Sequence, residues 1–211
     1  MRDITLILKH MFEIMDAIKK QRPKLYDLLQ DLMRNQGSYY SEDTVLYHIG
    51  DAVDKAFFIS EGFITRSSVV GKKKAVLSIF EKDEIKAGPD FMEQKPAEFL
   101  IEATAGTYVA YITHKQMKKV YGKFPEAHEL ASLIVSKHNR KEAQIRKMLL
   151  LKGIDLVEAF YLRFPLMTEP GSVLKDAKIA SFLRISVSLL REYRSELFAS
   201  GRLVNPAHKK A

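Results

Sequence analysis

The stretch from Lys175 to Leu197, KDAKIASFLRISVSLLREYRSEL, has the pattern of two short helices joined by a tight turn. Its apolar residues recur three or four positions apart, which is the spacing of one helix face. Ser186 stands between the two runs, where its hydroxyl can cap the second helix. The residues predicted to lie on the buried faces are Ile179, Ala180, Leu183, Leu189, Leu190, Tyr193 and Leu197.

Two short amphipathic helices joined in this way outline a helix-turn-helix, in which the second helix enters the major groove of DNA. The same outline also occurs as a packing unit in α-rich domains, so the helix pair alone leaves both uses open. If the second helix reads DNA, its exposed side makes the contacts and nearby cations meet phosphates. The residues predicted to contact DNA are Ser186, Val187, Ser188, Arg191 and Arg194, with Lys175, Lys178, Arg184 and Arg202 as candidates for phosphate contacts.

The net charge of +8 is divided unevenly along the chain. Residues 1–113 contain 15 Lys and Arg against 17 Asp and Glu, whereas residues 114–211 contain 19 against 9. Solubility alone does not require positive charge to be concentrated in one half of a chain. A surface that binds phosphates, in contrast, has to be positively charged. The charge pattern therefore favours a nucleic-acid partner for the C-terminal half.

The composition excludes several kinds of site. The chain has no Cys, which excludes disulfides, thiolate zinc sites, cysteine-ligated iron–sulfur clusters and cysteine nucleophiles. Its six His residues are scattered, and only His48 and His114 lie near the predicted barrel, so we predict no metal site, no cofactor and no enzyme activity. No apolar run reaches the roughly 18 residues of a membrane span, and the N-terminus lacks the apolar core of a signal peptide. We therefore expect a cytoplasmic protein without a membrane partner.

The first two thirds of the chain change from helical to strand patterning. Residues 3–35 have apolar residues at helical spacing, broken at Arg22-Pro23, which predicts two helices. Residues 39–113 contain six short β-rich runs separated by turn pairs, which indicates a small antiparallel barrel or sandwich. The predicted strand runs are TVLYHI, AFFIS, FITRSSVV, AVLSIF, FLIEAT and YVAYIT.

The spacing predicts a short helix at residues 114–121 and a long helix at 125–152, with Pro125 at its start. A helix of about 28 residues extends roughly 40 Å, which is longer than a small barrel needs for its own covering. The long helix can pair with a second copy across a two-fold axis, or it can cover its own barrel. We favour the homodimer, because a dimer would hold two reading helices at the spacing of two DNA half-sites.

The pattern IASFLxISxxxLxxxRxxL resembles the helix-turn-helix of the bacterial regulators related to the cyclic AMP receptor protein and the fumarate-nitrate reduction regulator (CRP/FNR family). The stretches 49–51 and 58–62 resemble turns of that family's cyclic-nucleotide-binding β-roll, and the resemblance covers about residues 39–204. It implies an α+β fold and a transcription regulator that acts as a homodimer, binds double-stranded DNA, responds to a small-molecule effector and works with RNA polymerase. The implied parts are N-terminal helices and a cyclic-nucleotide-binding-like antiparallel β-roll (1–124), a long dimerisation helix (125–152) and a C-terminal winged-helix-type helix-turn-helix with a shortened wing (153–211).

The chain departs from this family where cyclic AMP would bind. The family's ribose-binding Glu is replaced by Ala87, and its phosphate-binding Arg and the adjacent hydroxyl residue are replaced by Ala97 and Glu98. Loss of a bidentate Arg and gain of a carboxylate reverse the field at an anion site, so we do not expect cyclic AMP to bind. The dimer helix also keeps no hydroxyl residue at 142 or 143. The residues predicted to surround a pocket for an unknown effector are Lys86, Ala87, Gly88, Ala97, Glu98 and Glu142.

The reading helix departs as well. Arg184 replaces the usual turn Gly, which implies backbone strain if this residue adopts a positive φ. Val187, Ser188 and Glu192 replace family residues that read base pairs, and little sequence remains after Val204 for a second wing strand. These departures leave an alternative open, in which the chain is a sensor or scaffold that keeps the fold but does not bind DNA.

Overall fold

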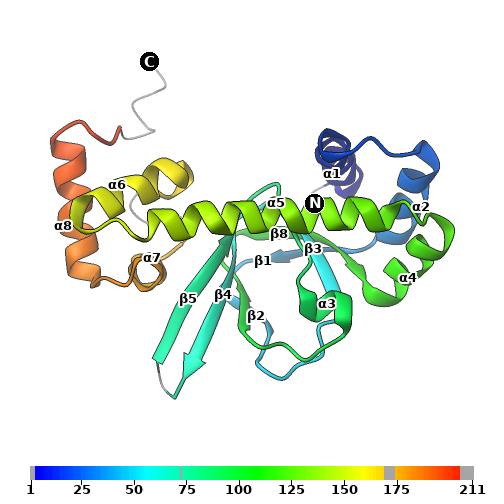
Figure 1. Ribbon diagram of the computed structural model, residues 1–211, viewed down its shortest axis with the longest axis horizontal. Coiled ribbons are helices and arrows are strands. Elements are labelled where there is room, and N and C mark those ends of the chain that lie inside the picture. The colour runs from blue at the N-terminus through cyan, green and yellow to red at the C-terminus, as the bar shows by residue number, and fades with distance from the viewer. Residues whose placement is uncertain (1–2, 72, 169–173, 205–211) are drawn as a thin grey trace. The chain divides into compact units, whose positions relative to one another are not determined.

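The computed structural model describes residues 3–71, 73–168 and 174–204, and Figure 1 shows the order of its elements. The helices are α1 (Ile4–Ile18), α2 (Pro23–Met33), α3 (Pro89–Glu93), α4 (His114–Lys123), α5 (Ala127–Met148), α6 (Gly153–Arg163), the 3-10 turn η1 (Pro165–Met167), α7 (Asp176–Leu183) and α8 (Val187–Ala199). The strands are β1 (Gly37–Tyr40), β2 (Thr44–Tyr47), β3 (Lys55–Glu61), β4 (Ile64–Val70), β5 (Lys73–Phe80), β6 (Ile85–Lys86), β7 (Leu100–Ala103) and β8 (Thr107–Thr113).

Two helices precede the strands, as the sequence predicted. The Asp3 carboxylate caps α1 by accepting a hydrogen bond from the Thr5 backbone N–H at 2.9 Å. The second helix, α2, begins at Pro23. Proline is tolerated there because the first N–H groups of a helix have no hydrogen-bond acceptor within the helix. Both helices bury one apolar stripe against the strands, through residues that include Leu8, Leu25 and Leu29.

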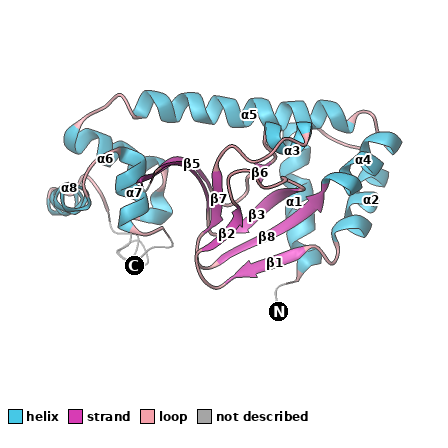
Figure 2. Cartoon of the chain, turned by 90° about the horizontal axis from the view of Figure 1, so that it is seen from below, coloured by secondary structure: helices cyan, strands magenta, loops and turns pink. Residues whose placement is uncertain are grey.

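The strands form two four-stranded sheets, with orders β1-β8-β3-β6 and β2-β7-β4-β5. Figure 2 shows β1, β8 and β3 side by side. β8 pairs antiparallel with both β1 and β3, and β2 pairs antiparallel with β7. All six predicted runs form strands, so the predicted antiparallel β-roll is confirmed. The elements β1, β6 and α3 were not predicted, because each is five residues or shorter and β6 is defined by its pairing with Phe57 and Phe58.

The turn between β3 and β4 requires glycine. Gly62 has a φ of +76°, and a Cβ at this position would lie 2.7 Å from the Cα of Thr107. Thr107 also stabilises this turn, because its hydroxyl accepts a hydrogen bond from the Phe63 N–H at 3.1 Å. The left-handed φ and the close backbone approach explain why this turn contains glycine.

The predicted helices at 114–121 and 125–152 are both present, with shifted ends. A reciprocal pair of hydrogen bonds between Thr113 and Gln116 caps α4. The long helix α5 covers Ala127–Met148, and the next residues form a tighter turn in which the Leu151 N–H donates to the Met148 carbonyl at 3.0 Å. The regular helix therefore ends four residues before the predicted end.

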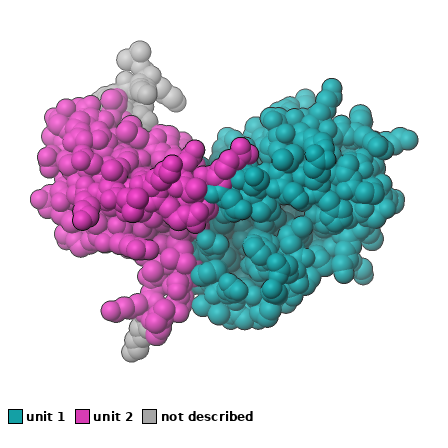
Figure 3. Space-filling view, viewed as in Figure 1, with its two compact units in different colours: residues 1–66, 79–139 teal, residues 67–78, 140–211 magenta. Residues whose placement is uncertain are grey.

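The chain divides into two compact units (Figure 3). Unit 1 comprises residues 1–66 and 79–139, and unit 2 comprises residues 67–78 and 140–211. Unit 1 has its core between the β-roll and the helices α1, α2, α4 and the first half of α5. Unit 2 has a core of buried aromatic rings, in which Phe160 contacts Tyr161, Phe164 and Phe182 at centroid distances of 5.1 to 5.9 Å.

No helix in the described part of the chain is long and apolar enough to cross a membrane. Within residues 3–71, 73–168 and 174–204, no three His, Asp or Glu side chains gather closely enough to hold a metal ion.

Candidate nucleic-acid interface

The helix-turn-helix of unit 2 forms as predicted. Ser186 caps α8, since its hydroxyl accepts a hydrogen bond from the Leu189 N–H at 3.1 Å. Arg184 ends α7 in the left-handed region, with a φ of +59° and a ψ of +37°. The Ile185 N–H donates to the Ala180 carbonyl at 3.1 Å, which completes the turn. The predicted backbone strain at Arg184 is therefore confirmed, because a left-handed conformation disfavours residues with a side chain.

A bidentate ion pair joins the two helices. The guanidinium of Arg194 on α8 donates to both carboxylate oxygens of Asp176, at 2.7 and 3.0 Å, and to the hydroxyl of Tyr161 on α6 at 3.0 Å. The side chains of Arg194 and Asp176 are only 11% and 19% exposed. The prediction that Arg194 lies on the exposed side of α8 is wrong, because its position three residues after Arg191 turns it toward α6 and the start of α7.

The ion pair also changes the protonation equilibria of its members. Hydrogen bonds from Arg194 and then Arg191 lower the pKa of Asp176 below its ordinary value, against the opposing effect of burial. The carboxylate of Asp176 in turn raises the pKa of Arg194. Burial raises the pKa of Tyr161 above its ordinary value of 10.0. Arg194 is therefore a charged structural residue that holds α6, α7 and α8 together.

The other predicted DNA contacts lie in different environments. Arg191 has a side chain that is 65% exposed and donates through Nε to Asp176 at 2.8 Å, which leaves its outer nitrogens facing solvent. Ser186, Ser188, Lys175 and Arg184 are exposed, and Val187 is half-buried. The ammonium nitrogen of Lys178 has almost no contact with solvent, so as placed it cannot reach a phosphate. The exposed part of the predicted set comprises Lys175, Arg184, Ser186, Ser188 and Arg191.

Two further features bear on the predicted interface. Arg202 pairs with Glu158 and with Asp155, at 3.0 Å from the latter, so its charge is balanced within unit 2, and its contact with a phosphate stays a prediction. The predicted wing is not formed in the described residues, since 200–203 make turns and Val204 belongs to no strand. Residues 205–211, which would hold a second wing strand, lie outside the described residues.

A basic hairpin belongs to the same unit as the helix-turn-helix. The Ser181 hydroxyl on α7 accepts from the Val76 N–H at 3.1 Å and donates to the Lys74 carbonyl at 3.4 Å, which attaches the edge of β5 to α7. Lys73 and Lys74 are exposed on this hairpin. This attachment was not predicted, because no local pattern in the sequence connects residues 74–76 with a serine more than 100 positions later.

The six residues predicted to surround an effector pocket are spread over different environments. Lys86 is 3% exposed, and its ammonium lies 3.8 Å from the Asp90 carboxylate and 5.9 Å from the centre of the Tyr47 ring. A Cβ on Gly88 would meet the Asp90 carboxylate at 2.2 Å, so that carboxylate fills the space beside Gly88. Ala97 is buried, Glu98 is exposed, and Glu142 belongs to unit 2.

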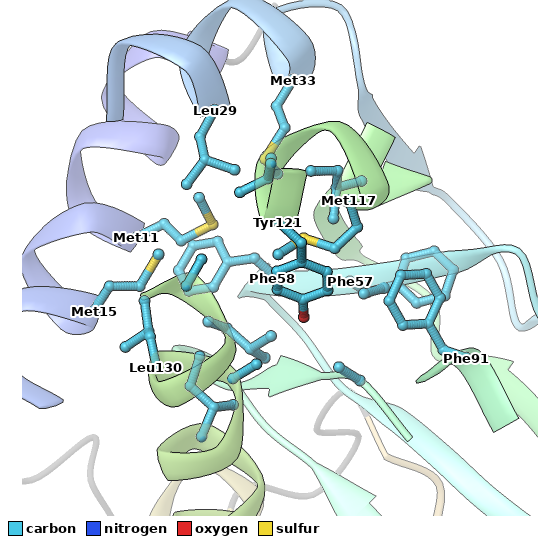
Figure 4. A pocket seen from close by; sticks show the side chains of 18 of the residues that line it. Met11, Met15, Leu29, Met33, Phe57, Phe58, Phe91, Met117, Tyr121 and Leu130 are labelled. Atoms are coloured by element: carbon cyan, nitrogen blue, oxygen red, sulfur yellow. The ribbon is translucent and has the colours of Figure 1, made fainter. Parts of the chain in front are cut away.

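Unit 1 contains an apolar cavity with a volume of about 90 Å³, shown in Figure 4. Its wall is built by α1, α2, β3, β8, the segment around β6 and α3, α4 and the first turns of α5. Of the six predicted effector residues, all of which are described, Ala87 lines this cavity and the other five do not. Successive strand residues point to opposite faces, so Ile85 and Ala87 face the cavity while Lys86 faces away from it.

The sequence matches no protein-family model, and no curated protein matches it. Solved structures do match. FixK2 from Bradyrhizobium japonicum is 14% identical, with 81% of this chain and 87% of that chain covered and a TM-score of 0.65. The c-di-GMP responsive global regulator CLP of Xanthomonas campestris is 15% identical, with 87% and 95% covered and a TM-score of 0.62.

A third match is a CooA mutant from Carboxydothermus hydrogenoformans, which is 15% identical, with 84% of this chain and 82% of that chain covered and a TM-score of 0.57. All three are CRP/FNR-type transcription regulators with a cyclic-nucleotide-binding domain fold. The aligned parts extend over most of both chains in each case, so the fold of this protein is the fold of these regulators, as the sequence resemblance implied.

Proposed function

We propose that this protein is a DNA-binding transcription regulator of the CRP/FNR type. The observation that carries the proposal is the capped α7–α8 helix-turn-helix, with Arg191 exposed on α8, in a chain that also contains the β-roll of these regulators. The division of charge supports it. Unit 2 contains 17 Lys and Arg against 7 Asp and Glu in its sequence, whereas the other unit has more acidic than basic residues.

The proposal includes a homodimer, cytoplasmic location and an effector other than cyclic AMP. Ala87 and Ala97 offer no charge or hydrogen-bonding side chain to a cyclic phosphate or a ribose. Lys86 is the nearest cation in the sequence, but its ammonium is buried beside Asp90. Contact with RNA polymerase is a further expectation of this proposal, and we assign no residue to it.

The dimer proposal is supported by exposed leucines in the turn that follows α5. Leu150 and Leu151 are 79% and 44% exposed, and clustered apolar side chains in water mark interaction surfaces. The middle of α5 is less suited to self-association, because Lys137, Arg140 and Gln144 are exposed there. We therefore place the main dimer contact at the end of the helix, with a second copy of this chain as the partner.

We expect Leu150→Asp to weaken the dimer by about tenfold or more, since a charge would have to be buried at the contact. Sedimentation velocity at several concentrations would measure the monomer–dimer equilibrium. Leu6→Asp is the matched control, because Leu6 is a 65% exposed leucine on α1 and should not change the equilibrium. Equal behaviour of the two variants would contradict the assignment of the contact to Leu150.

The DNA-binding proposal is tested by fluorescence anisotropy with labelled genomic fragments and random duplexes of the same length, at about 50 and 200 mM salt. We expect tighter binding to some fragments than to random DNA. Arg191→Ala should weaken binding and reduce the slope of log affinity against log salt concentration by about one, as for the loss of one phosphate contact. Arg202→Ala is the control, because its charge is already paired with Asp155 and Glu158.

The second candidate is a sensor or scaffold that does not bind DNA. It is favoured by Glu192 and Glu196, which are exposed and place two negative charges on the surface of α8. The two candidates differ in the same assay. Absence of any complex at 50 mM salt, with the dimer intact, would support the scaffold and remove the regulator.

A further inference from the structure

The apolar cavity of unit 1 is larger than the gaps that protein cores normally leave. Well-packed interiors have few voids larger than a water molecule, and one water needs roughly 10 to 15 Å³ of such volume. The cavity here has about 90 Å³, which is several times that size. The cavity is partly open to the surface, and Met92 in its lining is 37% exposed. The cavity can therefore exchange its contents with solvent.

The lining has a composition suited to an apolar guest. It is formed by aliphatic, aromatic and methionine side chains, with the Tyr121 hydroxyl as the one side-chain polar group that the lining residues carry. That hydroxyl already lies 3.9 Å from the sulfur of Met92, and the Tyr121 ring stacks on His128 at 3.8 Å between centroids. A charged guest would lose its hydration in this cavity without gaining a partner, which costs several kcal/mol or more. An uncharged apolar guest has no such cost.

Methionine is strongly concentrated in this wall. Five of the eight methionines of the chain line the cavity: Met11, Met15, Met33, Met92 and Met117. They come from α1, α2, α3 and α4, and Figure 4 shows Met11, Met15, Met33 and Met117 around one space. Methionine side chains are flexible and polarisable, so such a wall adapts to guests of different outline. A core built only for rigidity would use branched side chains with fewer rotamers.

We propose that this cavity is a binding site for a small, uncharged, apolar molecule, such as an aromatic ring or a short hydrocarbon chain. Its size supports a compact guest, because an engineered cavity of about 150 Å³ binds benzene and flexible methionines allow this smaller cavity to widen. The guest would contact Leu130, Ala131 and Ile134 in the first turns of α5. If the protein is the regulator proposed above, this places the effector on the helix that continues into unit 2.

The site is tested with toluene and benzoate as a matched pair of probes, since the two have the same ring and differ in charge. Methyl-labelled methionine gives NMR signals for both the site and an internal control in the full-length protein. Toluene is expected to shift the signals of the five lining methionines and to leave Met167, which is buried in unit 2, unchanged. Benzoate at the same concentration is expected to shift none of them.

Ala131→Leu fills the cavity and should weaken toluene binding by about tenfold or more, a loss of about 1.4 kcal/mol. Ser132→Leu adds the same side chain at the next position, which is exposed and outside the lining, and should bind as the wild type does. Ala87→Leu fills the cavity from the opposite wall, and it replaces Ala131→Leu in this test if Ala131→Leu does not fold. Unchanged methionine signals in the wild type, or equal toluene binding by both leucine variants at 131 and 132, would overturn the proposal. These outcomes are read without DNA, so they leave the regulator proposal unaffected.

Discussion

Replacing Arg194 with methionine is expected to lower the free energy of unfolding of unit 2 by about 2 to 4 kcal/mol. Methionine keeps much of the side-chain length but leaves the partly buried Asp176 carboxylate without its bidentate partner and the Tyr161 hydroxyl without its donor. The loss would appear as faster hydrogen exchange in α7 and α8, and as a thermal transition lower by roughly 10 °C or more. DNA binding would fall as a consequence of lost structure.

Arg191→Met is the matched control, because Arg191 pairs with the same Asp176 but has a 65% exposed side chain. Exposed ion pairs contribute about 0 to 1 kcal/mol, so this variant should keep its stability and lose affinity for DNA. The opposite result, in which Arg191→Met unfolds unit 2 and Arg194→Met affects only DNA affinity, would contradict the assignment of the two arginines.

The same ion pair predicts a loss of stability in acid. Because the pKa of Asp176 is lowered in the folded state, the unfolded state takes up the proton first as the pH falls. The stabilisation is complete above the ordinary pKa of 3.8 and is lost as the pH falls from there through the lowered pKa of the folded state. Arg194→Met removes most of this lowering, so its stability should change less over that interval than that of the wild type.

Arg191 and Arg194 also show what sequence reasoning could and could not resolve. Apolar spacing was sufficient to predict both helices, because the buried residues Ile179, Leu183 and Leu190 follow the helical period. The position of Arg194 depended on a tertiary partner, since Asp176 lies 18 residues earlier and is brought close only when the turn at Arg184 folds. The helical period identifies the buried apolar face of α8. It does not show whether a charged residue at the edge of that face, such as Arg194, points to solvent or to a neighbouring helix.

The β-roll and the cavity show the same limit. The six main strands could be predicted from β-rich runs and turn pairs, whereas β6 is two residues long and exists through its pairing with β3. That pairing decides which side Lys86 faces, so the predicted effector set mixed residues from opposite faces of one strand. The methionines of the cavity come from four helices spread between residues 4 and 123, and nothing in the spacing of Met11, Met33 and Met117 indicates a common wall.

The burial of Lys86 leads to the second large prediction, that Lys86→Met raises the free energy of unfolding at pH 7 by about 1 to 4 kcal/mol. Lys86 is 3% exposed, its ammonium has no hydrogen-bond partner among the described residues, and an Asp90 carboxylate oxygen lies 3.8 Å away. Methionine fills a similar volume without a charge to desolvate. Asp90 differs from Asp176 because it accepts a hydrogen bond from the Phe91 N–H at 3.0 Å and none from Lys86, so loss of this cation breaks no hydrogen bond of the carboxylate.

The pH dependence gives this prediction a second readout. Burial lowers the pKa of Lys86, Arg66 lowers it further and Asp90 acts in the opposite direction. Between the lowered pKa and the ordinary value of 10.5, the unfolded state binds more protons than the folded state, so wild-type stability should rise with pH in that interval. Urea unfolding at pH 7 and at about pH 9.5 would measure this, with Lys82→Met, an exposed lysine on the preceding turn, as control. A Lys86→Met protein that is less stable than the wild type at pH 7 would mean that attraction to Asp90 exceeds the cost of burying the charge.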